Sequence, residues 1–365
     1  MKIFLILYML CSYMFSQGII ESGSFYSESL NEQRNYTIYL PEGYYDSDDT
    51  YPVVYFLHGF GGDNNSYNSF HSSLNSLASD DLIIDMIVVN ADGSTDVYDG
   101  SFYTNSILNG NYEDYIAYDL VNHIDDSFRT LAMREYRALS GHSMGGYGAF
   151  RLGLYNDDIF SSLAAHSGPI HLENLNNPFL INVILIEAFF GDLEPNNGPM
   201  TMMLFGLSSA FSPNLDNPPW YVDLPINNSG NVDWDVFTLW QAHDPYLLID
   251  NHVSSLLTQN IYFDCGNQDE LQLFPHSEDM NTKLNQLGIP HTYEPYSGTH
   301  SGNINERLET SFQFHSDYFS SIEFGLLGDI NDDGLLNILD IVLVIGFILN
   351  NSTPTDTEFI ASDIN

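Results

Sequence analysis

Ser143 stands at the centre of residues 141–145 (GHSMG), which match the G-x-S-x-G pattern. In this pattern the serine occupies a sharp turn between a strand and a helix, where glycines let neighbouring backbones approach closely. A short apolar run at 136–139 precedes the turn, and a helical pattern at 145–155 follows it. The hydroxyl would then lie near the positive end of the helix, which favours developing negative charge. These features predict that Ser143 is a nucleophile.

His300 is the predicted general base for this serine. A serine hydroxyl needs a base, and for this motif the partners follow in the chain order serine, acid, histidine. His300 lies in a loop after the strand-like run 292–296, where such a base is delivered. Other histidines fit less well: His276 and His291 lie in no such loop, and His166 and His243 come too early for this order.

Asp269 is the predicted acid that orients the base. It follows the apolar strand 261–264 and precedes His300, as the chain order requires. Asp264 would still lie within that strand, and Glu270 is the neighbouring alternative. We therefore expect Asp269 to accept the hydrogen bond that holds the imidazole in place.

The oxyanion of the tetrahedral intermediate needs two backbone N–H groups, each worth about 3 kcal/mol of the barrier. Met144, the residue after the nucleophile, is expected to supply one of them. The loop 58–62 (HGFGG) follows an early strand and is expected to supply the other from Phe60, with Gly61 as the next choice. The alternative is a plain glycine-rich connection with no part in the chemistry.

Alternating strand and helix patterns between residues 18 and about 322 must position these groups. The predicted strands are 36–40, 52–57, 83–89, 136–139, 160–165, 261–264 and 292–296, and the predicted helices include 66–78, 112–128 and 145–155. Strands separated by helices are typical of an α/β domain with a mostly parallel sheet covered on both faces.

Residues 170–242 interrupt this alternation, because they are rich in Asn, Pro and Gly around one apolar run. A long insertion late in such a sheet commonly forms a lid over the site. Its three tryptophans, Trp220, Trp234 and Trp240, have two interpretations. They form the insertion's own small core, or they offer a platform on which a sugar or aryl group stacks.

The composition sets limits on the class of protein. The chain has 365 residues, 44% of them hydrophobic, which is enough for one large domain and a small appendage. Its 8 basic against 49 acidic residues give a net charge of −41. Such a charge repels nucleic acid and phosphorylated cofactors, and it favours solubility in a salty medium over a specific cationic partner. No cofactor is expected for catalysis.

Residues 1–17 have the pattern of a secretory signal: Lys2, an apolar run and a small-residue cleavage site. The run is too short to cross a membrane, so a secreted protein at the cell surface or outside the cell is predicted. Without this segment Cys265 is the sole cysteine, which rules out an internal disulfide. Its apolar strand predicts a small core residue.

The segment from residue 323 onward contains no Lys or Arg, and residues 329–340 have the spacing of a calcium loop. The predicted ligands are Asp329, Asn331, Asp333, Leu335 (through its carbonyl), Asn337 and Asp340. Together with a helix at 338–349, the loop resembles a type I dockerin repeat, although its last position is Asp rather than Glu. The alternative is a simple acidic turn.

Dockerins carry two repeats, and the resemblance implies a cohesin-like partner. The last three residues, 363–365 (DIN), repeat the opening of the loop at 329–331. We therefore expect a truncated second repeat, weakened partner binding and a calcium site of reduced affinity. The predicted organisation is a signal at 1–17, an α/β domain at 18–322 and a dockerin-like repeat at 323–365.

Residues 53–62, 141–146, 263–266 and 298–300 together resemble the esterase D-like branch of the α/β-hydrolases. That branch includes feruloyl and acetyl-xylan esterases, S-formylglutathione hydrolases and mycolyltransferases. The resemblance covers roughly residues 30–320 apart from the insertion. It implies the α/β-hydrolase fold and ester hydrolysis through an acyl-enzyme, with a triad of Ser143, Asp269 and His300.

The predicted function is therefore a secreted serine carboxylic ester hydrolase. Its expected substrate is a feruloyl or acetyl ester of a polysaccharide, or a related small ester. One alternative is an acyltransferase that uses the same site, and another is a non-catalytic secreted binding or attachment protein on a hydrolase scaffold. A serine peptidase is less favoured, since amides demand more leaving-group assistance and no residue pattern supplies it.

Overall fold

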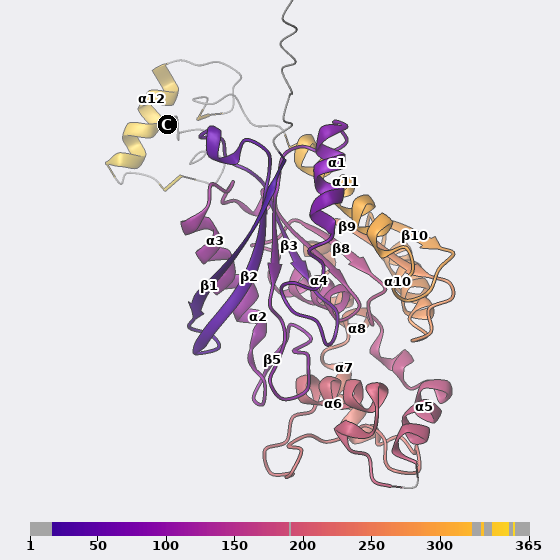
Figure 1. The fold of residues 1–365 in the computed structure, drawn as a ribbon. Coiled ribbons are helices and arrows are strands. Elements are labelled where there is room, and N and C mark those ends of the chain that lie inside the picture. The colour runs from indigo at the N-terminus through magenta and orange to yellow at the C-terminus, as the bar shows by residue number, and fades with distance from the viewer. Residues whose placement is uncertain (1–16, 190, 323–329, 332–337, 350–352, 355–365) are drawn as a thin grey trace, which may run out of the picture.

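The computed structural model describes residues 17–189, 191–322, 330–331, 338–349 and 353–354. Its main feature is an eight-stranded sheet (Figure 1). The strands are β1 (Ile19–Ser27), β2 (Glu32–Leu40), β3 (Val53–Leu57), β4 (Ile87–Ala91), β7 (Arg137–His142), β8 (Ser162–His166), β9 (Asn260–Gly266) and β10 (Thr292–Tyr296). A separate small hairpin joins β5 (Asn105–Ser106) to β6 (Gly110–Asn111). The predicted signal at residues 1–17 falls almost entirely outside the described residues.

The strand order in the main sheet is β1-β2-β4-β3-β7-β8-β9-β10. The six strands from β4 to β10 are mutually parallel, whereas β1 and β2 pair antiparallel at one edge. All carboxyl ends of the parallel strands therefore meet at one edge of the sheet, where an open α/β sheet places its ligand site. The predicted mostly parallel α/β-hydrolase sheet is confirmed.

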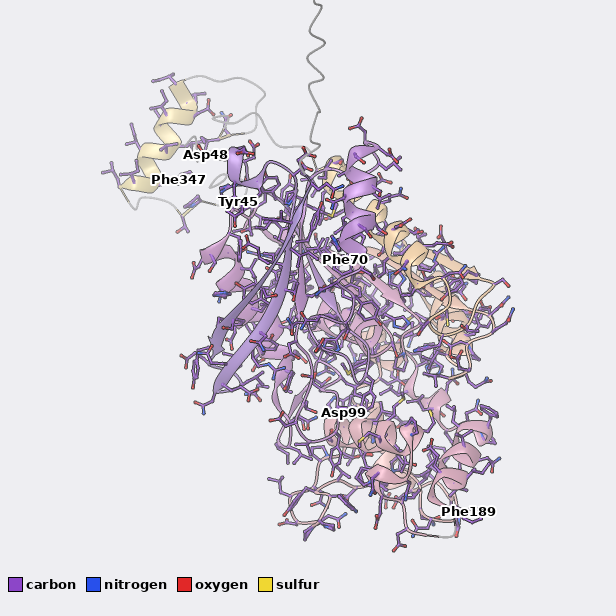
Figure 2. The ribbon with its side chains drawn as sticks, viewed as in Figure 1. Tyr45, Asp48, Phe70, Asp99, Phe189 and Phe347 are labelled. Carbon is purple, nitrogen blue, oxygen red and sulfur yellow. The ribbon has the colours of Figure 1, made fainter. Side chains whose placement is uncertain are left out.

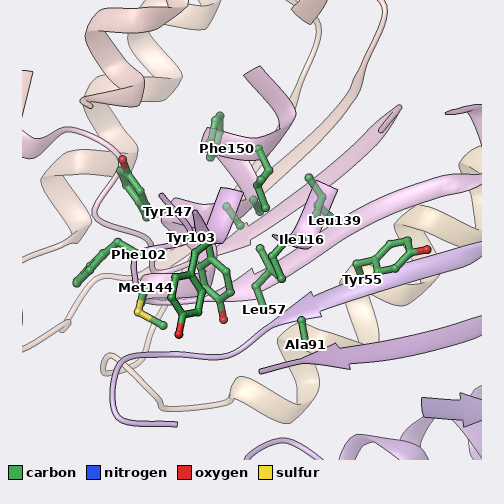
Figure 3. Packing of buried hydrophobic residues seen from close by; sticks show 14 of the residues in the cluster. Tyr55, Leu57, Ala91, Phe102, Tyr103, Ile116, Leu139, Met144, Tyr147 and Phe150 are labelled. Atoms are coloured by element: carbon green, nitrogen blue, oxygen red, sulfur yellow. The ribbon is translucent and has the colours of Figure 1, made fainter. Parts of the chain in front are cut away.

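Alternation along the buried strands divides the core into two layers. In β3, Val53, Tyr55 and Leu57 face one layer, and Val54 and Phe56 face the other. The larger layer, part of which Figure 3 shows, packs on helices α3 (Val121–Ser127), α4 (Met144–Tyr155) and α10 (Phe274–Leu287). The smaller layer packs on α1 (Phe70–Ser79) and α11 (Ile304–Ser321). Helices therefore cover both faces, so a continuous apolar run such as PVVYFL is buried on both sides.

The helices on the sheet are α1 (Phe70–Ser79), α2 (Tyr112–Asp114), α3 (Val121–Ser127), α4 (Met144–Tyr155), α8 (Pro245–Leu248), α9 (Val253–Leu256), α10 (Phe274–Leu287) and α11 (Ile304–Ser321). A π-helical turn at Tyr115–Leu120 joins α2 to α3. The predicted insertion contains α5 (Pro178–Ala188), α6 (Pro199–Phe211) and α7 (Trp234–Gln241). These three helices form a cap at the carboxyl edge of the sheet, and Figure 2 shows Asp99 of the sheet domain beside α6.

One predicted strand is shifted in the structure, and one edge strand was not predicted. The strand predicted at 83–89 begins only at Ile87 and continues to Ala91. Residues before it cross the end of α11, where the Ile84 N–H donates to the Ser316 hydroxyl instead of to a neighbouring strand. The edge strand β1 was not predicted, because most of its side chains are exposed or half-buried and form no apolar run.

The helix predicted at 338–349 is present as α12 (Ile338–Ile348). Asp340, in its first turn, accepts hydrogen bonds from the backbone N–H groups of Ile330 at 2.9 Å and Asn331 at 3.4 Å. Within the described residues, no helix combines the length and apolar character needed to cross a lipid bilayer.

Candidate active site

Ser143 lies on a strained turn between β7 and α4. Its φ of 59° and ψ of −115° are unusual for a residue with a side chain, and it directly precedes the first turn of α4. The turn holds only because glycines flank it. A Cβ on Gly145 would lie 1.9 Å from the Leu57 carbonyl oxygen, and one on Gly141 would lie 2.3 Å from the Gly145 oxygen. Both glycines of the G-x-S-x-G pattern are therefore required by close backbone contact.

The structure brings the three predicted triad residues together at the carboxyl edge of the sheet. His300 Nε2 lies 2.9 Å from Ser143 Oγ, and His300 Nδ1 lies 2.8 Å from Asp269 Oδ2. The carboxylate can only accept, so Nδ1 carries the proton and Nε2 is free to accept the serine proton. All three residues are buried, with 8%, 8% and 4% exposure for Ser143, His300 and Asp269. This arrangement suits nucleophilic attack assisted by a general base.

The alternative acids have other partners. Glu270 accepts the backbone N–H of His300 at 2.9 Å, so it supports the loop rather than the imidazole. Asp264 pairs with His166 Nδ1 at 2.9 Å and with Arg307 Nε at 2.8 Å. Burial alone would raise the pKa of Asp264, but His166 and Arg307 outweigh it and lower that pKa. Asp264 thus belongs to a separate cluster with Arg307 and His166, apart from the imidazole of His300.

The predicted oxyanion donors lie beside Ser143. Met144 begins α4, so its N–H has no acceptor within the helix. Gly59 packs against the serine, since a Cβ there would lie 3.5 Å from Ser143 Cβ. The Gly61 N–H is already bound to the Asp99 carbonyl at 3.0 Å. No acceptor in the described part of the chain takes the Phe60 N–H, which leaves Phe60 rather than Gly61 available as a donor.

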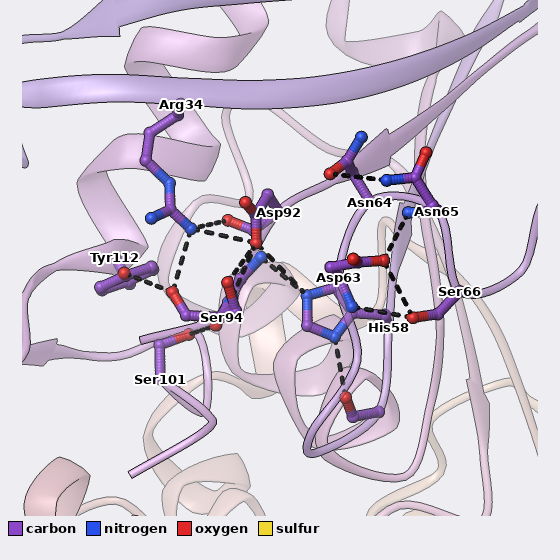
Figure 4. Close-up of polar contacts among 12 residues, drawn as sticks. Arg34, His58, Asp63, Asn64, Asn65, Ser66, Asp92, Ser94, Ser101 and Tyr112 are labelled. Atoms are coloured by element: carbon purple, nitrogen blue, oxygen red, sulfur yellow. Dashed lines mark hydrogen bonds and ion pairs between the residues drawn. The ribbon is translucent and has the colours of Figure 1, made fainter. Parts of the chain in front are cut away.

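Buried polar contacts anchor the loop that carries Phe60 (Figure 4). His58 Nδ1 contacts the Gly59 carbonyl at 2.8 Å, and His58 Nε2 accepts the Gly93 N–H at 2.9 Å. The Arg34 guanidinium binds Asp92, through the carboxylate at 3.1 Å and the carbonyl at 2.6 Å. Burial lowers the pKa of His58, which keeps it neutral and able to accept at Nε2. The loop is therefore held rigidly before substrate binds, as an oxyanion hole requires.

The sequence analysis missed His142, which occupies the variable position before the nucleophile. His142 Nε2 donates to the His300 carbonyl at 2.9 Å, and Tyr67 Oη lies 2.7 Å from His142 Nδ1. Burial and the neighbouring His300 lower the pKa of His142 to about 3, so the ring is neutral. Because Nε2 carries its single proton, Nδ1 must accept from the Tyr67 hydroxyl. No sequence pattern signals this role, since the contact joins residues 158 positions apart.

A second missed contact involves Cys265 of β9. It is fully buried, as the sequence analysis predicted, and burial raises the pKa of its thiol. Its Sγ lies 3.6 Å from Asp269 Oδ2, the same oxygen that receives His300 Nδ1–H. The Leu271 N–H binds the other oxygen, Asp269 Oδ1, at 2.8 Å. These contacts fix the orientation of the carboxylate.

A pocket opens directly against Ser143 beneath the cap. Together with its mouth it has about 810 Å³ of empty space, and helices α5, α6 and α7 supply much of its wall. Of the three tryptophans, Trp240 lines this pocket and is buried, Trp220 packs on Phe205, and Trp234 is exposed. The predicted insertion therefore covers the site.

The predicted calcium ligands lie near the other end of the chain. Of the six predicted calcium ligands, Asp329, Asp333, Leu335 and Asn337 lie outside the described residues. Asn331 and Asp340 are described, and the Asn331 backbone N–H donates to the Asp340 carboxylate at 3.4 Å. Within the described ranges, no three His, Cys, Asp or Glu side chains are grouped as a metal site would need.

Comparison with curated proteins identifies relatives that are esterases. An esterase of Mycobacterium tuberculosis is 32% identical over 139 residues, which cover 37% of this chain and 29% of the relative. An endo-1,4-β-xylanase/feruloyl esterase of Xylanibacter ruminicola is 29% identical over 195 residues, covering 50% and 26%. The chain thus spans little more than a quarter of the length of these relatives.

Comparison with solved structures shows the same fold. A ferulic acid esterase aligns with a TM-score of 0.62 at 18% identity, covering 83% of this chain and 99% of that one. An S-formylglutathione hydrolase of Staphylococcus aureus aligns with a TM-score of 0.56 at 19% identity, covering 82% and 100%. The Esterase family model matches residues 27–304, a span that includes Ser143, Asp269 and His300. The chain therefore belongs to the Esterase family, a group of carboxylic ester hydrolases with the α/β-hydrolase fold.

Proposed function

We propose that this protein is a serine carboxylic ester hydrolase that works through an acyl-enzyme on Ser143. The observation that carries the proposal is the unbroken hydrogen-bonded line from Ser143 Oγ through His300 to Asp269, at 2.9 and 2.8 Å. The names of the relatives, which include a feruloyl esterase, support the same reaction class.

The proposed reaction has two halves. His300 Nε2 removes the Ser143 proton as Oγ attacks the ester carbonyl, and Asp269 stabilises the resulting imidazolium. The N–H groups of Phe60 and Met144 bind the oxyanion, and His300 then protonates the departing alcohol. Water, deprotonated by the same imidazole, attacks the acyl-enzyme and releases the acid.

The test uses Ser143→Ala with Ser301→Ala as the matched control, because Ser301 is exposed beside His300. Turnover of p-nitrophenyl acetate and labelling by a fluorophosphonate are measured for both. We expect the first variant to lose labelling and on the order of 10⁶-fold in kcat, and the second to keep both. Labelling of Ser143→Ala equal to that of the parent would refute the assignment. Product analysis with an added sugar acceptor separates hydrolysis from acyl transfer.

We also propose that the protein is secreted and that its C-terminal loop binds calcium. Secretion is inferred from residues 1–17, and the calcium site from the spacing of oxygen ligands at 329–340. Calorimetric titration of the full chain with CaCl₂ is expected to show one binding event, abolished in Asp333→Ala. Absence of heat in the parent chain would contradict the calcium site. A cohesin-like partner stays a prediction.

A further inference from the structure

The pocket against Ser143 has an unusually uniform wall. Among its lining residues only Ser143 and Asn176 have polar side chains apart from the indole of Trp240. The Trp240 Nε1–H is already donated to the Ser212 hydroxyl at 2.9 Å. The rest of the wall is aliphatic, aromatic, proline or methionine, so beyond the nucleophile a bound acyl group meets almost no hydrogen-bonding partner.

Trp240 does not offer a free stacking face. Its ring is stacked on Phe237 at 5.9 Å and meets Phe211 edge-on at 5.7 Å. Trp220 belongs to a different surface depression, together with Met202 and Tyr98. Trp240 and Trp220 therefore pack within the insertion, and they do not form a platform on which a sugar or aryl group stacks. The pocket is not built to grip a planar aryl group from both sides.

We propose that the acyl group held by this pocket is an aliphatic chain of several carbons, rather than a feruloyl or acetyl group. This inference rests on the proposed ester hydrolysis at Ser143 and concerns its substrate class. An acetyl group beside Ser143 would contact only a small part of this apolar wall, which continues along α5, α6 and α7. A feruloyl group would bury a phenolic hydroxyl and a methoxy oxygen in a wall whose one amide is Asn176, and an unpaired buried hydroxyl disfavours binding.

An aliphatic chain fits the wall in chemistry and in shape. Each methylene that leaves water for an apolar surface contributes in proportion to its buried area. Met200 and Met203 of α6 add flexible side chains, which adapt to chains of different length.

The experiment measures kcat/KM for p-nitrophenyl esters from acetate to dodecanoate, at concentrations below substrate aggregation, and for a ferulate ester. Each buried methylene is expected to raise kcat/KM three- to fourfold, so octanoate exceeds butanoate by on the order of 10²-fold. The rise stops at the chain length that fills the pocket. The ferulate ester is expected to be a poorer substrate than octanoate.

A matched pair of variants tests the location of the chain. Met203 lines the pocket, whereas the adjacent Met202 faces the separate depression next to Trp220. Met203→Trp is expected to lower the octanoate-to-butanoate ratio at least tenfold, and Met202→Trp to leave it unchanged. An unchanged ratio in Met203→Trp would place the chain elsewhere and overturn the proposal. The chain-length profile of kcat/KM is measured on the parent protein, so this part of the test does not depend on whether a variant folds.

The two proposals fail in different ways. A kcat/KM that does not change with chain length, while fluorophosphonate still labels Ser143, overturns the proposal of an aliphatic acyl group. The proposed hydrolase activity is not affected by that result. A preference for ferulate that disappears in Asn176→Leu overturns it as well and identifies the amide as the phenol's partner. A parent protein whose Ser143 is not labelled by fluorophosphonate and that turns over no ester would instead refute the proposed function.

Discussion

The hydrogen bond between Tyr67 and His142 is expected to control the position of His300, the proposed general base. Tyr67→Phe removes only the hydroxyl, and it keeps the ring contact with Phe56, whose centroid lies 4.9 Å away. His142 Nδ1 then has no donor, although the ring is fully buried. Leaving such an acceptor unpaired costs about 1–3 kcal/mol of stability.

The effect on catalysis follows from the second bond of the same ring. Without the Tyr67 donor, only the His300 carbonyl still favours the proton on Nε2, so the tautomer of His142 with its proton on Nδ1 becomes more populated. A proton on Nδ1 would set the Nε2 lone pair against the His300 carbonyl, now 2.9 Å away. The two would repel and displace the loop that carries His300. A shift of about 1 Å at reacting groups lowers rates about 100-fold, so we expect kcat to fall ten- to 100-fold with little change in KM.

The assay pairs p-nitrophenyl ester kinetics with urea unfolding. Tyr45→Phe is the control, because Tyr45 is exposed and its hydroxyl binds only the surface residue Glu21. It is expected to match the parent in both measurements. A Tyr67→Phe variant that loses stability but keeps its parent kcat would show that the contact is merely structural. Unchanged stability together with unchanged kcat would refute the assigned proton on His142.

Two further predictions concern stability. Gly145→Ala would force a Cβ to 1.9 Å from the Leu57 carbonyl, so we expect little folded protein, measured by circular dichroism and soluble yield; a stable, active variant would contradict the turn geometry. Burial lowers the pKa of His142, His276 and His315 from 6.5 to about 3. Below pH 6.5 these histidines are therefore protonated in the unfolded chain but not in the folded chain. The free energy of unfolding is highest above pH 6.5 and falls as the pH is lowered toward 3. Each histidine lowers the free energy of unfolding by about 1.4 kcal/mol per pH unit in this range. Urea midpoints that stay constant from pH 7 to pH 5 would show that these rings are not buried in the neutral form.

The sequence alone predicted the serine and the histidine that the structure brings together, and it predicted the class of fold. Ser143 was predictable because its turn needs glycines at fixed local spacing, and His300 because the order of partners follows the order of strands. The continuous apolar run at 52–57 likewise indicates burial on both faces. Each of these signals lies within one short segment of chain.

Other features depended on contacts between distant segments, and only the tertiary structure decided them. Asp269 rather than Glu270 faces the imidazole because the β9 turn directs one side chain at the ring and the other at the His300 backbone. The role of His142 depends on partners 75 and 158 positions away. The wall of the pocket comes from helices packed over Ser143, and the polarity of a cavity follows from which faces meet. Local sequence therefore predicted the residues of the triad, and long-range packing determined their orientation and the lining of the pocket beside them.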